Sequence, residues 1–359
     1  MKFGGMVATK IDDWEIFPYL EKLEFDSGWA PDSQMIWSDC YATLSLAAHN
    51  THRLRLGTGV AIAGTRLAPV TAHSIASINK LAPGRVFLGI GTGHTAMRIM
   101  GQNPVSPVSF TEYLRVVRRL LAGDEVDYTY NGKTQPIKFL DRDLECIDIG
   151  NRVPIYVAAN GPKALRAAGA YGDGRIGAGN EPKPVFLRNI ERIERGAAEV
   201  GRVMPNNFHS AVMTFACVLK PGEKLSSERV VEETGAQVVA SLHFWYELYR
   251  QKGHDNFIMD SVRDVWDAYK LYVETEMPLE RRHLILHQGH CANLPAQERR
   301  FVTSSMIKAS GGLVGEADEL IARIKELEEA GLREVVLMPP RNSMRKNFET
   351  FATQVMKKL

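Results

Sequence analysis

The sequence has few of the features that mark secreted, membrane-spanning or disulfide-stabilised proteins. It contains four cysteines, Cys40, Cys146, Cys217 and Cys291, and none of them forms a C-x-x-C pair, so we expect reduced thiols. No run of about 18 apolar residues occurs, so no transmembrane helix is expected. Acidic residues interrupt the first apolar segment, which argues against a signal peptide. These absences favour a cytoplasmic protein.

An excess of charge of one sign is also absent. The chain has 44 basic and 42 acidic residues in a length of 359, giving a formal net charge of +2. A nucleic-acid-binding protein usually has a strong basic excess, so a small-molecule substrate is the expected partner. We find no internal repeat, no low-complexity segment and no linker between domains. The sequence therefore predicts a single domain over residues 1–359.

Short apolar runs alternate with amphipathic stretches along the whole chain. Such β-α-β-α alternation predicts a parallel sheet with helices outside it, and about eight units over this length favour a closed (β/α)8 TIM barrel over an open doubly wound sheet. The expected strands are Lys2–Ala8, Gly28–Ala30, Leu54–Val60, Arg85–Ile90, Val153–Ala158, Gly174–Gly177, His209–Leu219 and Glu334–Met338.

Two segments interrupt this rhythm and are expected to be insertions. Residues 124–148 are polar and aromatic with a turn at Asn131-Gly132, which predicts a hairpin. Residues 243–282 are rich in aromatic and charged side chains and are expected to add helices before the last unit. Insertions after barrel strands lie at the C-terminal face, where active sites are found. The helical insertion could line a substrate pocket, or it could simply pack or contact another subunit.

Small residues follow three of the expected strands. Gly91, Thr92 and Gly93 follow one of these strands. With Gly89 they make the spacing G-x-G-x-G, which differs from the dinucleotide-binding fingerprint. Asn160-Gly161-Pro162 leads from a strand into a helix, where free backbone N–H groups attract phosphate. Gly177–Asn180 has a similar composition. Each loop alone could be an ordinary turn, but together they suggest one wide ligand across the mouth of the barrel.

Several motifs resemble the luciferase-like monooxygenase superfamily. They are Leu54–Val60, Thr65-Arg66 with Pro69–Ala72, the GRVFLGIGTGH segment at 84–94, and VPIYVAANGPKALRAAGAYGDGRI from residue 153. The pattern is most similar to the branch that holds methylenetetrahydromethanopterin reductase and deazaflavin-dependent glucose-6-phosphate dehydrogenase. The resemblance covers most of residues 1–200 and returns at Gly311–Met338, but it does not cover the 243–282 insertion.

The resemblance implies a site for coenzyme F420 or FMN, with the former slightly favoured. A non-prolyl cis peptide at Gly59-Val60 would support the ring, the Gly91–Gly93 loop would meet its polar edge, and Asn160–Pro162 would hold the phosphate. The cofactor-binding candidates are Ser33, Thr58, Gly59, Val60, Gly91, Thr92, Gly93, Asn160, Gly161, Pro162, Gly179 and Asn180.

His94 and Asp32 are the catalytic candidates. His94 directly follows the glycine loop, and an imidazole can move protons near neutral pH, although it could instead only orient the cofactor. Asp32 could contact the ring or cap the following segment. Relatives that act on sugar phosphate have Asp-His where this chain has Asp32-Ser33, and glutamate where it has His94. The resemblance therefore does not extend to that substrate.

The function expected from this resemblance is hydride transfer or monooxygenation of a small organic substrate. A homodimer is expected, and with FMN a flavin reductase would supply the reduced cofactor. Two alternatives remain open. One is a zinc-dependent barrel hydrolase that uses His283, His287 and His290, although the resemblance calls for no metal. The other is a catalytically silent flavin-binding protein.

Overall fold

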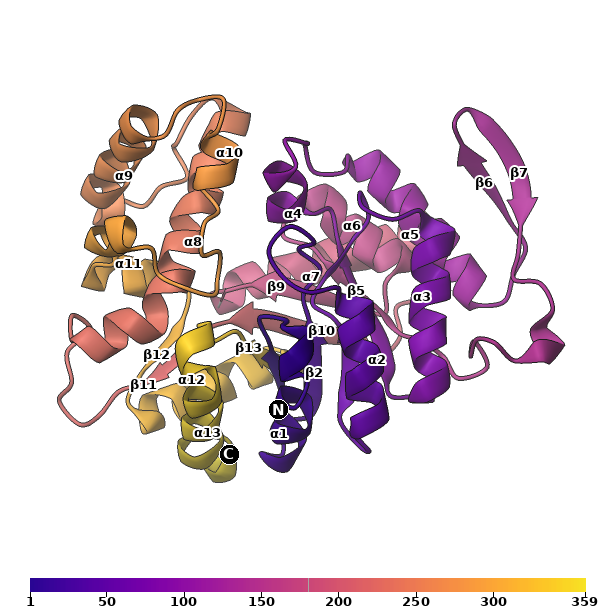
Figure 1. The fold of residues 1–359 in the computed structure, drawn as a ribbon, viewed down its shortest axis with the longest axis horizontal. Coiled ribbons are helices and arrows are strands. Elements are labelled where there is room, and N and C mark those ends of the chain that lie inside the picture. Colours follow the sequence, from indigo (N-terminus) through magenta and orange to yellow (C-terminus); the bar gives the residue numbers. More distant parts are fainter. Residues whose placement is uncertain (180) are drawn as a thin grey trace.

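Parallel strands form a closed barrel in the computed structural model, which describes residues 1–179 and 181–359 (Figure 1). In the order of the ring, neighbouring strands pair side by side, and pairing of Leu56 with Val86 closes it. This arrangement confirms the predicted (β/α)8 barrel. The barrel strands are β3 (Arg55–Thr58), β2 (Ser27–Ala30), β1 (Lys2–Met6), β13 (Glu334–Leu337), β10 (His209–Thr214), β9 (Gly174–Ala178), β8 (Ile155–Ala158) and β5 (Val86–Gly91).

Helices surround the barrel and begin at residues that suit helix starts. Asp39 caps one helix by accepting a hydrogen bond from the Ala42 N–H at 2.9 Å, and Ser106 caps another through Ser109. Glu316 and Glu319 form a capping box at a third. The surrounding helices are α1 (Ile16–Lys22), α2 (Cys40–Asn50), α3 (Ala68–Leu81), α5 (Pro107–Leu121), α6 (Pro162–Tyr171), α7 (Lys183–Glu199), α12 (Ala317–Glu329) and α13 (Met344–Gln354).

The barrel interior is filled with side chains and carries a buried polar cluster at its lower end. Trp29 and Phe87 pack with ring centroids 4.3 Å apart. Below them, the carboxylate of Glu334 accepts hydrogen bonds from Ser27, from His209 Nε2 at 2.6 Å and from Trp29 Nε1 at 3.3 Å. These residues lie at or near the amino ends of their strands, which is the end of a TIM barrel associated with stability.

A helical unit follows the seventh barrel strand and its extension β11 (Ala216–Val218), which pairs with β12 (Leu313–Gly315). It contains α8 (Glu228–Lys252), α9 (Arg263–Glu276), α10 (Arg282–Ile285) and α11 (Ser304–Ala309), which gather on one side of the barrel in Figure 1. The unit thus begins before the expected boundary at residue 243, because α8 continues through that residue. Trp266, Tyr269 and Tyr246 are buried in its own core, so most of its aromatic side chains serve packing.

The second insertion is an antiparallel hairpin of β6 (Val126–Tyr130) and β7 (Lys133–Ile137), drawn at the far right of Figure 1. Asn131 and Gly132 form its turn, both with positive φ. The hairpin lies between the end of α5 and the start of β8. A helix-to-strand connection belongs to the amino ends of the strands, so this insertion is rooted at the face opposite the barrel mouth.

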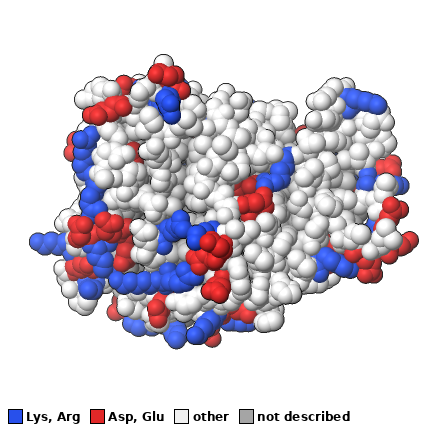
Figure 2. All heavy atoms as spheres, viewed as in Figure 1, with Lys and Arg blue, Asp and Glu red and all other residues white. Residues whose placement is uncertain are grey.

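The surface carries basic and acidic side chains side by side. On the face in Figure 2, Lys and Arg alternate with Asp and Glu, with the densest mixture at the lower left. This agrees with the small net charge of +2. Among the described residues, no helix combines the length and apolar character that crossing a bilayer requires.

Candidate active site at the barrel mouth

A cavity of about 540 Å³ lies between the carboxyl ends of the barrel strands and the helical unit. This volume lies within the usual range for small-molecule sites. The barrel contributes Asn160, Gly179, Met213 and Met338 to its wall, and α8 contributes Gln237, Ser241, His243 and Phe244. His290, Cys291, Ser310 and Gly311 complete much of the remaining wall.

The amide of Gln237 fixes the helical unit to the barrel mouth. It donates to the carbonyl oxygen of Met338, which follows β13, at 2.8 Å, and to that of Cys291 at 3.2 Å. The bond to Met338 thus joins the two parts of the chain between which the cavity lies, and the bond to Cys291 joins two segments of the helical unit.

The predicted cis peptide bond between Gly59 and Val60 is present. Val60 packs beside the loop that follows β5: a Cβ atom added to Gly91 would lie 3.0 Å from Val60 Cγ2 and 3.2 Å from the Cβ of Ala158. The structure thus brings together the predicted segments Gly59-Val60 and Gly91–Gly93, which are far apart in the sequence.

Gly93 ends this loop and begins a short helix, α4 (His94–Ile99), that the sequence reading did not expect. Its φ of 82° lies in the left-handed region, and a Cβ atom there would lie only 2.4 Å from Ile62 Cγ2. Both conditions require glycine. The neighbouring Thr92 is half-buried and accepts a hydrogen bond from the Val105 N–H through its carbonyl oxygen.

Thr58 is placed differently from its prediction as a cofactor-binding residue. Its side chain is fully buried, and its hydroxyl donates to the carbonyl oxygen of Gly89 at 2.6 Å. The hydroxyl therefore joins the two barrel strands β3 and β5. Threonine stands in the same motif as Gly59, so its position in the sequence could not reveal this orientation.

Asp32 is buried and engaged by other protein groups. Its carboxylate forms an ion pair with Arg66 and accepts a hydrogen bond from the Ile62 N–H at 3.3 Å. Arg66 also bonds Asp39, the cap of α2, at 2.9 Å. This network favours a structural role for Asp32 over the predicted catalytic one. Ser33 is half-buried, and its carbonyl oxygen accepts hydrogen bonds in the turn that follows.

The predicted phosphate loop lies at the start of α6. Gly161 is the N-cap residue, Pro162 occupies the first turn, and no side chain among the described residues caps this helix. A Cβ atom on Gly161 would meet nothing within 4 Å, so space is open in front of the helix start. The unpaired N–H groups of a first helical turn attract anions.

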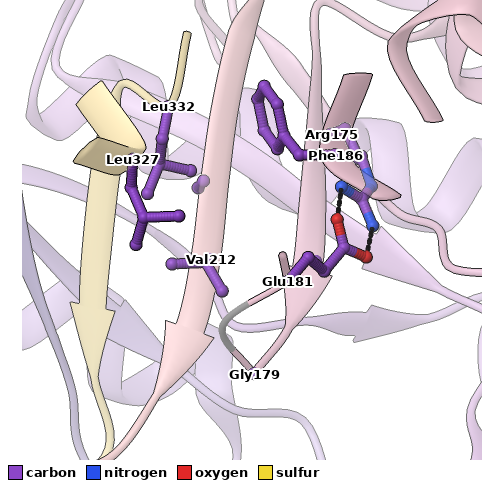
Figure 3. A pocket seen from close by; sticks show the side chains of 9 residues that line it. Arg175, Gly179, Glu181, Phe186, Val212, Leu327 and Leu332 are labelled. Atoms are coloured by element: carbon purple, nitrogen blue, oxygen red, sulfur yellow. Dashed lines mark hydrogen bonds and ion pairs between the residues drawn. The ribbon is translucent and has the colours of Figure 1, made fainter. Parts of the chain in front are cut away.

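An ion pair between Arg175 and Glu181 lies next to the predicted phosphate loop and holds it through hydrogen bonds. Arg175 donates to the carboxylate of Glu181 at 2.8 and 2.5 Å, as Figure 3 shows. It also donates to the Ala159 carbonyl oxygen at 2.8 Å and to Asn160 Oδ1 at 3.3 Å. The cavity drawn in Figure 3 measures only about 10 Å³, too little for a cofactor. The pair therefore orders the Asn160 loop instead of forming a site of its own.

Gly179 borders both the large cavity and the small one. Its φ is 70°, and its N–H donates to the carbonyl oxygen of Met213 at 2.8 Å, which anchors the end of β9 to β10. Asn180, the other predicted cofactor-binding residue here, lies outside the described residues.

His94 begins α4 at the cavity, next to the lining residue Thr95. Its ring lies 5.4 Å from that of Phe244 on α8, nearly perpendicular to it. His94 is exposed as a residue, but the protein atoms around its imidazole disfavour the charged ring, and this desolvation lowers its pKa. The charge of Arg98 lowers the pKa further, and Glu247 opposes the shift. The neutral imidazole is therefore favoured near pH 7.

A histidine cluster at the cavity wall differs from the one considered in the sequence. Three ring nitrogens, one each from His243, His287 and His290, lie within 4.8 Å of one another. His283 is not part of this group. A spacing of four residues could place His283 and His287 on one face of a helix, but α10 ends at Ile285. His243 was missed because α8 brings it into place from a distant part of the sequence.

Together, the barrel and the cavity at the carboxyl ends of its strands define a TIM-barrel protein with a small-molecule site at its mouth. The family model for luciferase-like monooxygenases matches residues 14–334. The chain belongs to the luciferase-like monooxygenase family.

Two relatives illustrate the similarity in sequence. The 5,10-methylenetetrahydromethanopterin reductase of Methanolobus tindarius is 38% identical over 223 residues, which cover 62% of this chain and 64% of that protein. The F420-dependent hydroxymycolic acid dehydrogenase of Mycobacterium tuberculosis is 31% identical over 212 residues, covering 55% and 56%. The matches thus span less than two thirds of the length of these relatives.

A solved structure shows the same fold over nearly the full chain. The coenzyme F420 dependent tetrahydromethanopterin reductase from Methanopyrus kandleri superposes with a TM-score of 0.68 at 20% identity, covering 99% of each chain. The shared fold includes the helical unit that the sequence resemblance did not cover.

Proposed function

We propose that this protein is an oxidoreductase that transfers a hydride between coenzyme F420 and a small organic substrate in the mouth cavity. The observation that carries the proposal is the convergence of Gly59-Val60, Gly91–Gly93 and Asn160–Pro162 around one end of the barrel. Similarity to a methylenetetrahydromethanopterin reductase and to an F420-dependent dehydrogenase supports it.

The residues at the mouth suit a long flat cofactor with a phosphate group. Val60 and the glycine loop after β5 would contact the ring, because Gly91 presents no side chain there. The start of α6 would hold the phosphate through backbone N–H groups, with Gly161 leaving room for it. When bound, the deazaflavin supplies the position that accepts or donates the hydride.

His94 is the residue proposed to move the proton that accompanies hydride transfer. Its pKa is lowered, so the neutral imidazole can accept a proton from a substrate hydroxyl or amine and return it in the reverse direction. Asp32 is proposed to act only through structure, by holding Arg66 and the backbone of Ile62 at the edge of the mouth.

The remaining expectations are also proposals. We propose one domain over residues 1–359, supported by the hydrogen bond of Gln237 between the helical unit and the barrel. The four free cysteines, of which Cys146 is exposed, support a reducing cytoplasmic location. A homodimer is proposed from the family resemblance, and light scattering of the purified protein would measure the assembly directly.

Titration of the purified apo-protein with F420 and with FMN, each oxidised and reduced, tests the proposal by fluorescence. Selective binding of F420, followed by its reduction or oxidation with alcohols or imines, is the expected result. Preference for reduced FMN with oxygen uptake would instead indicate a monooxygenase that needs a flavin reductase. Binding of F420 without turnover of any such substrate would favour a silent binding protein. Failure to bind either cofactor would overturn the proposal.

A further inference from the structure

Two buried imidazoles and a half-buried one meet at the wall of the mouth cavity without saturating their hydrogen-bonding capacity. The rings of His243 and His287 lie 5.8 Å apart at 89°, and those of His287 and His290 lie 5.8 Å apart at 82°. The side chains of His243 and His287 are almost inaccessible to solvent, at 1% and 2% exposure. The Nδ1 atom of each of the three rings is buried and has no hydrogen-bond partner among the described residues.

Carboxylates define the tautomers of two of these rings. His243 Nε2 lies 3.0 Å from Glu298, and His287 Nε2 lies 2.7 Å from Glu247. An ionised carboxylate only accepts hydrogen bonds, so Nε2 of His243 and of His287 carries the hydrogen, and each of these neutral rings leaves a lone pair on Nδ1. Carboxylates commonly hold metal-ligating histidines in this way, fixing ring orientation and raising ligand basicity.

These carboxylates are themselves held in place. Glu298 is buried and also accepts a hydrogen bond from the Tyr269 hydroxyl at 3.2 Å. Glu247 forms an ion pair with Arg98 Nε at 2.8 Å. The ring of His290 is placed by its contact with Cys291 Sγ at 3.5 Å. The cluster is thus pre-organised from α4, from α8 and from the segment after α10.

Other ways of satisfying these ring nitrogens are less complete. One water molecule donates only two hydrogen bonds, so it serves all three Nδ1 atoms only if His290 carries its proton on Nδ1. Protonating the rings instead would bring positive charges close together in a place largely shielded from water. A metal cation accepts all three lone pairs at once. Zinc bonds of about 2.1 Å would place the nitrogens roughly 3.4 Å apart, and one ring nitrogen from each of the three residues already lies within 4.8 Å of the others.

We propose that His243, His287 and His290 bind one divalent transition-metal ion through their Nδ1 atoms, with Zn²⁺ as the best-matched ion. Imidazole ligands suit zinc, and three histidines leave one coordination position free. His243 and His290 line the cavity, so that position faces the space proposed for the substrate. An oxygen or nitrogen atom of a substrate, or a water molecule, can occupy it. This site departs from the family resemblance, which calls for no metal.

Metal binding is measured on the full chain without any organic cofactor, so its outcome is separate from that of the proposed function. Protein stripped with a chelator is titrated with Zn²⁺ in competition with a chromophoric chelator, and metal content is measured by mass spectrometry. We expect one Zn²⁺ per chain and a rise in Tm on binding. Absence of stoichiometric binding, or of any stabilisation, would overturn the proposal.

Matched variants locate the site. His290→Gln should lower Zn²⁺ affinity at least ~100-fold, and Glu298→Gln, which changes only the support of His243, should lower it roughly 10–100-fold. His283→Gln, a few residues away but outside the cluster, should bind as the wild type does. Equal affinity of the His290 and His283 variants would refute the assignment. Tm values of the metal-free proteins show whether each variant folds, and the Zn²⁺-dependent rise in Tm should vanish only in His290→Gln.

Discussion

A negative charge introduced at position 161 should weaken cofactor binding without lowering the stability of the fold. Gly161 is the N-cap of α6 with φ −89° and ψ 156°, a conformation that other residues adopt freely. A Cβ atom there meets nothing within 4 Å, so neither Gly161→Asp nor Gly161→Asn disturbs packing. Both are good N-cap residues, and an acidic group also interacts favourably with a helix N-terminus. Each variant should therefore be as stable as the wild type or more stable by a few tenths of a kcal/mol.

The two variants should differ in cofactor affinity. If the phosphate lies at this helix start, the carboxylate introduced by Gly161→Asp would stand about 5 Å from it. Two like charges at that distance repel by about 1 kcal/mol in water and about 3 kcal/mol at an effective dielectric constant of 20. Gly161→Asp should thus raise Kd roughly 5–150-fold relative to Gly161→Asn, because the two side chains have nearly the same shape.

Fluorescence titration of F420 at low and high salt measures this difference. The gap between the two variants should narrow at high salt, because salt screens the repulsion. Equal affinities for the Asp and Asn variants would show that no phosphate sits at α6. A gap that salt does not change would also contradict the reasoning. Thermal unfolding without cofactor serves as the control for folding.

Three further predictions follow from other contacts. Because the pKa of His94 is lowered, turnover should persist below pH 6.5 and fall as the pH drops through that lowered pKa. His94→Gln should reduce kcat and remove this loss of activity at acid pH, and an unchanged pH profile would exclude the proton-transfer role. Thr58→Val should lower the free energy of unfolding by about 1–2 kcal/mol in a urea titration but leave F420 affinity unchanged, because the Thr58 hydroxyl bonds Gly89. A large loss of F420 affinity would show that Thr58 contacts the cofactor. Glu334→Ala should cost about 3–5 kcal/mol of unfolding free energy, since it leaves the buried Ser27 and His209 without this acceptor. The exposed Glu329→Ala should cost little, and similar values for both variants would refute the role of the lower cluster.

The pH dependence of that lower cluster has a definite sign. Burial alone would raise the pKa of Glu334, but the hydrogen bond and charge of His209 outweigh it and lower the pKa in the folded state. The stabilisation is therefore fully present above the pKa of the unfolded chain and is lost as pH falls through the folded value. In Glu334→Ala this part of the acid destabilisation should be absent.

The sequence predicted the barrel because the residues within each strand and helix carry the hydrophobic pattern of that element. A buried strand such as Val86–Gly91 is a continuous apolar run, and the helix after it shows its own period. The strand-end loops were likewise visible, since glycine and asparagine mark them directly. Side-chain orientation was not visible: nothing near Thr58 in the sequence shows that its hydroxyl reaches another strand. The same limit applies to Asp32, whose partner Arg66 lies 34 positions away.

The histidine cluster shows why tertiary contacts decided the rest. Spacing alone favoured His283 with His287, since i and i+4 share a face of a helix. The structure ends α10 at Ile285, which separates that pair, and supplies His243 from the middle of α8. Glu247, one turn after His243 on α8, was the local signal that could have pointed to this face, because it holds His287.

The short helix α4 links the two halves of the proposed site. It starts at His94, directly after the glycine loop, and carries Arg98 one turn later. Arg98 pairs with Glu247, and Glu247 orients His287. The loop proposed to meet the cofactor and the cluster proposed to bind a metal are thus joined by one turn of helix and two charged contacts. The strength of the partly buried Arg98–Glu247 ion pair depends on the positions of both side chains. A shift of the glycine loop would therefore be transmitted through Arg98 to the histidine cluster. The helical unit therefore places polar groups, as well as the ring of Phe244, against the barrel mouth.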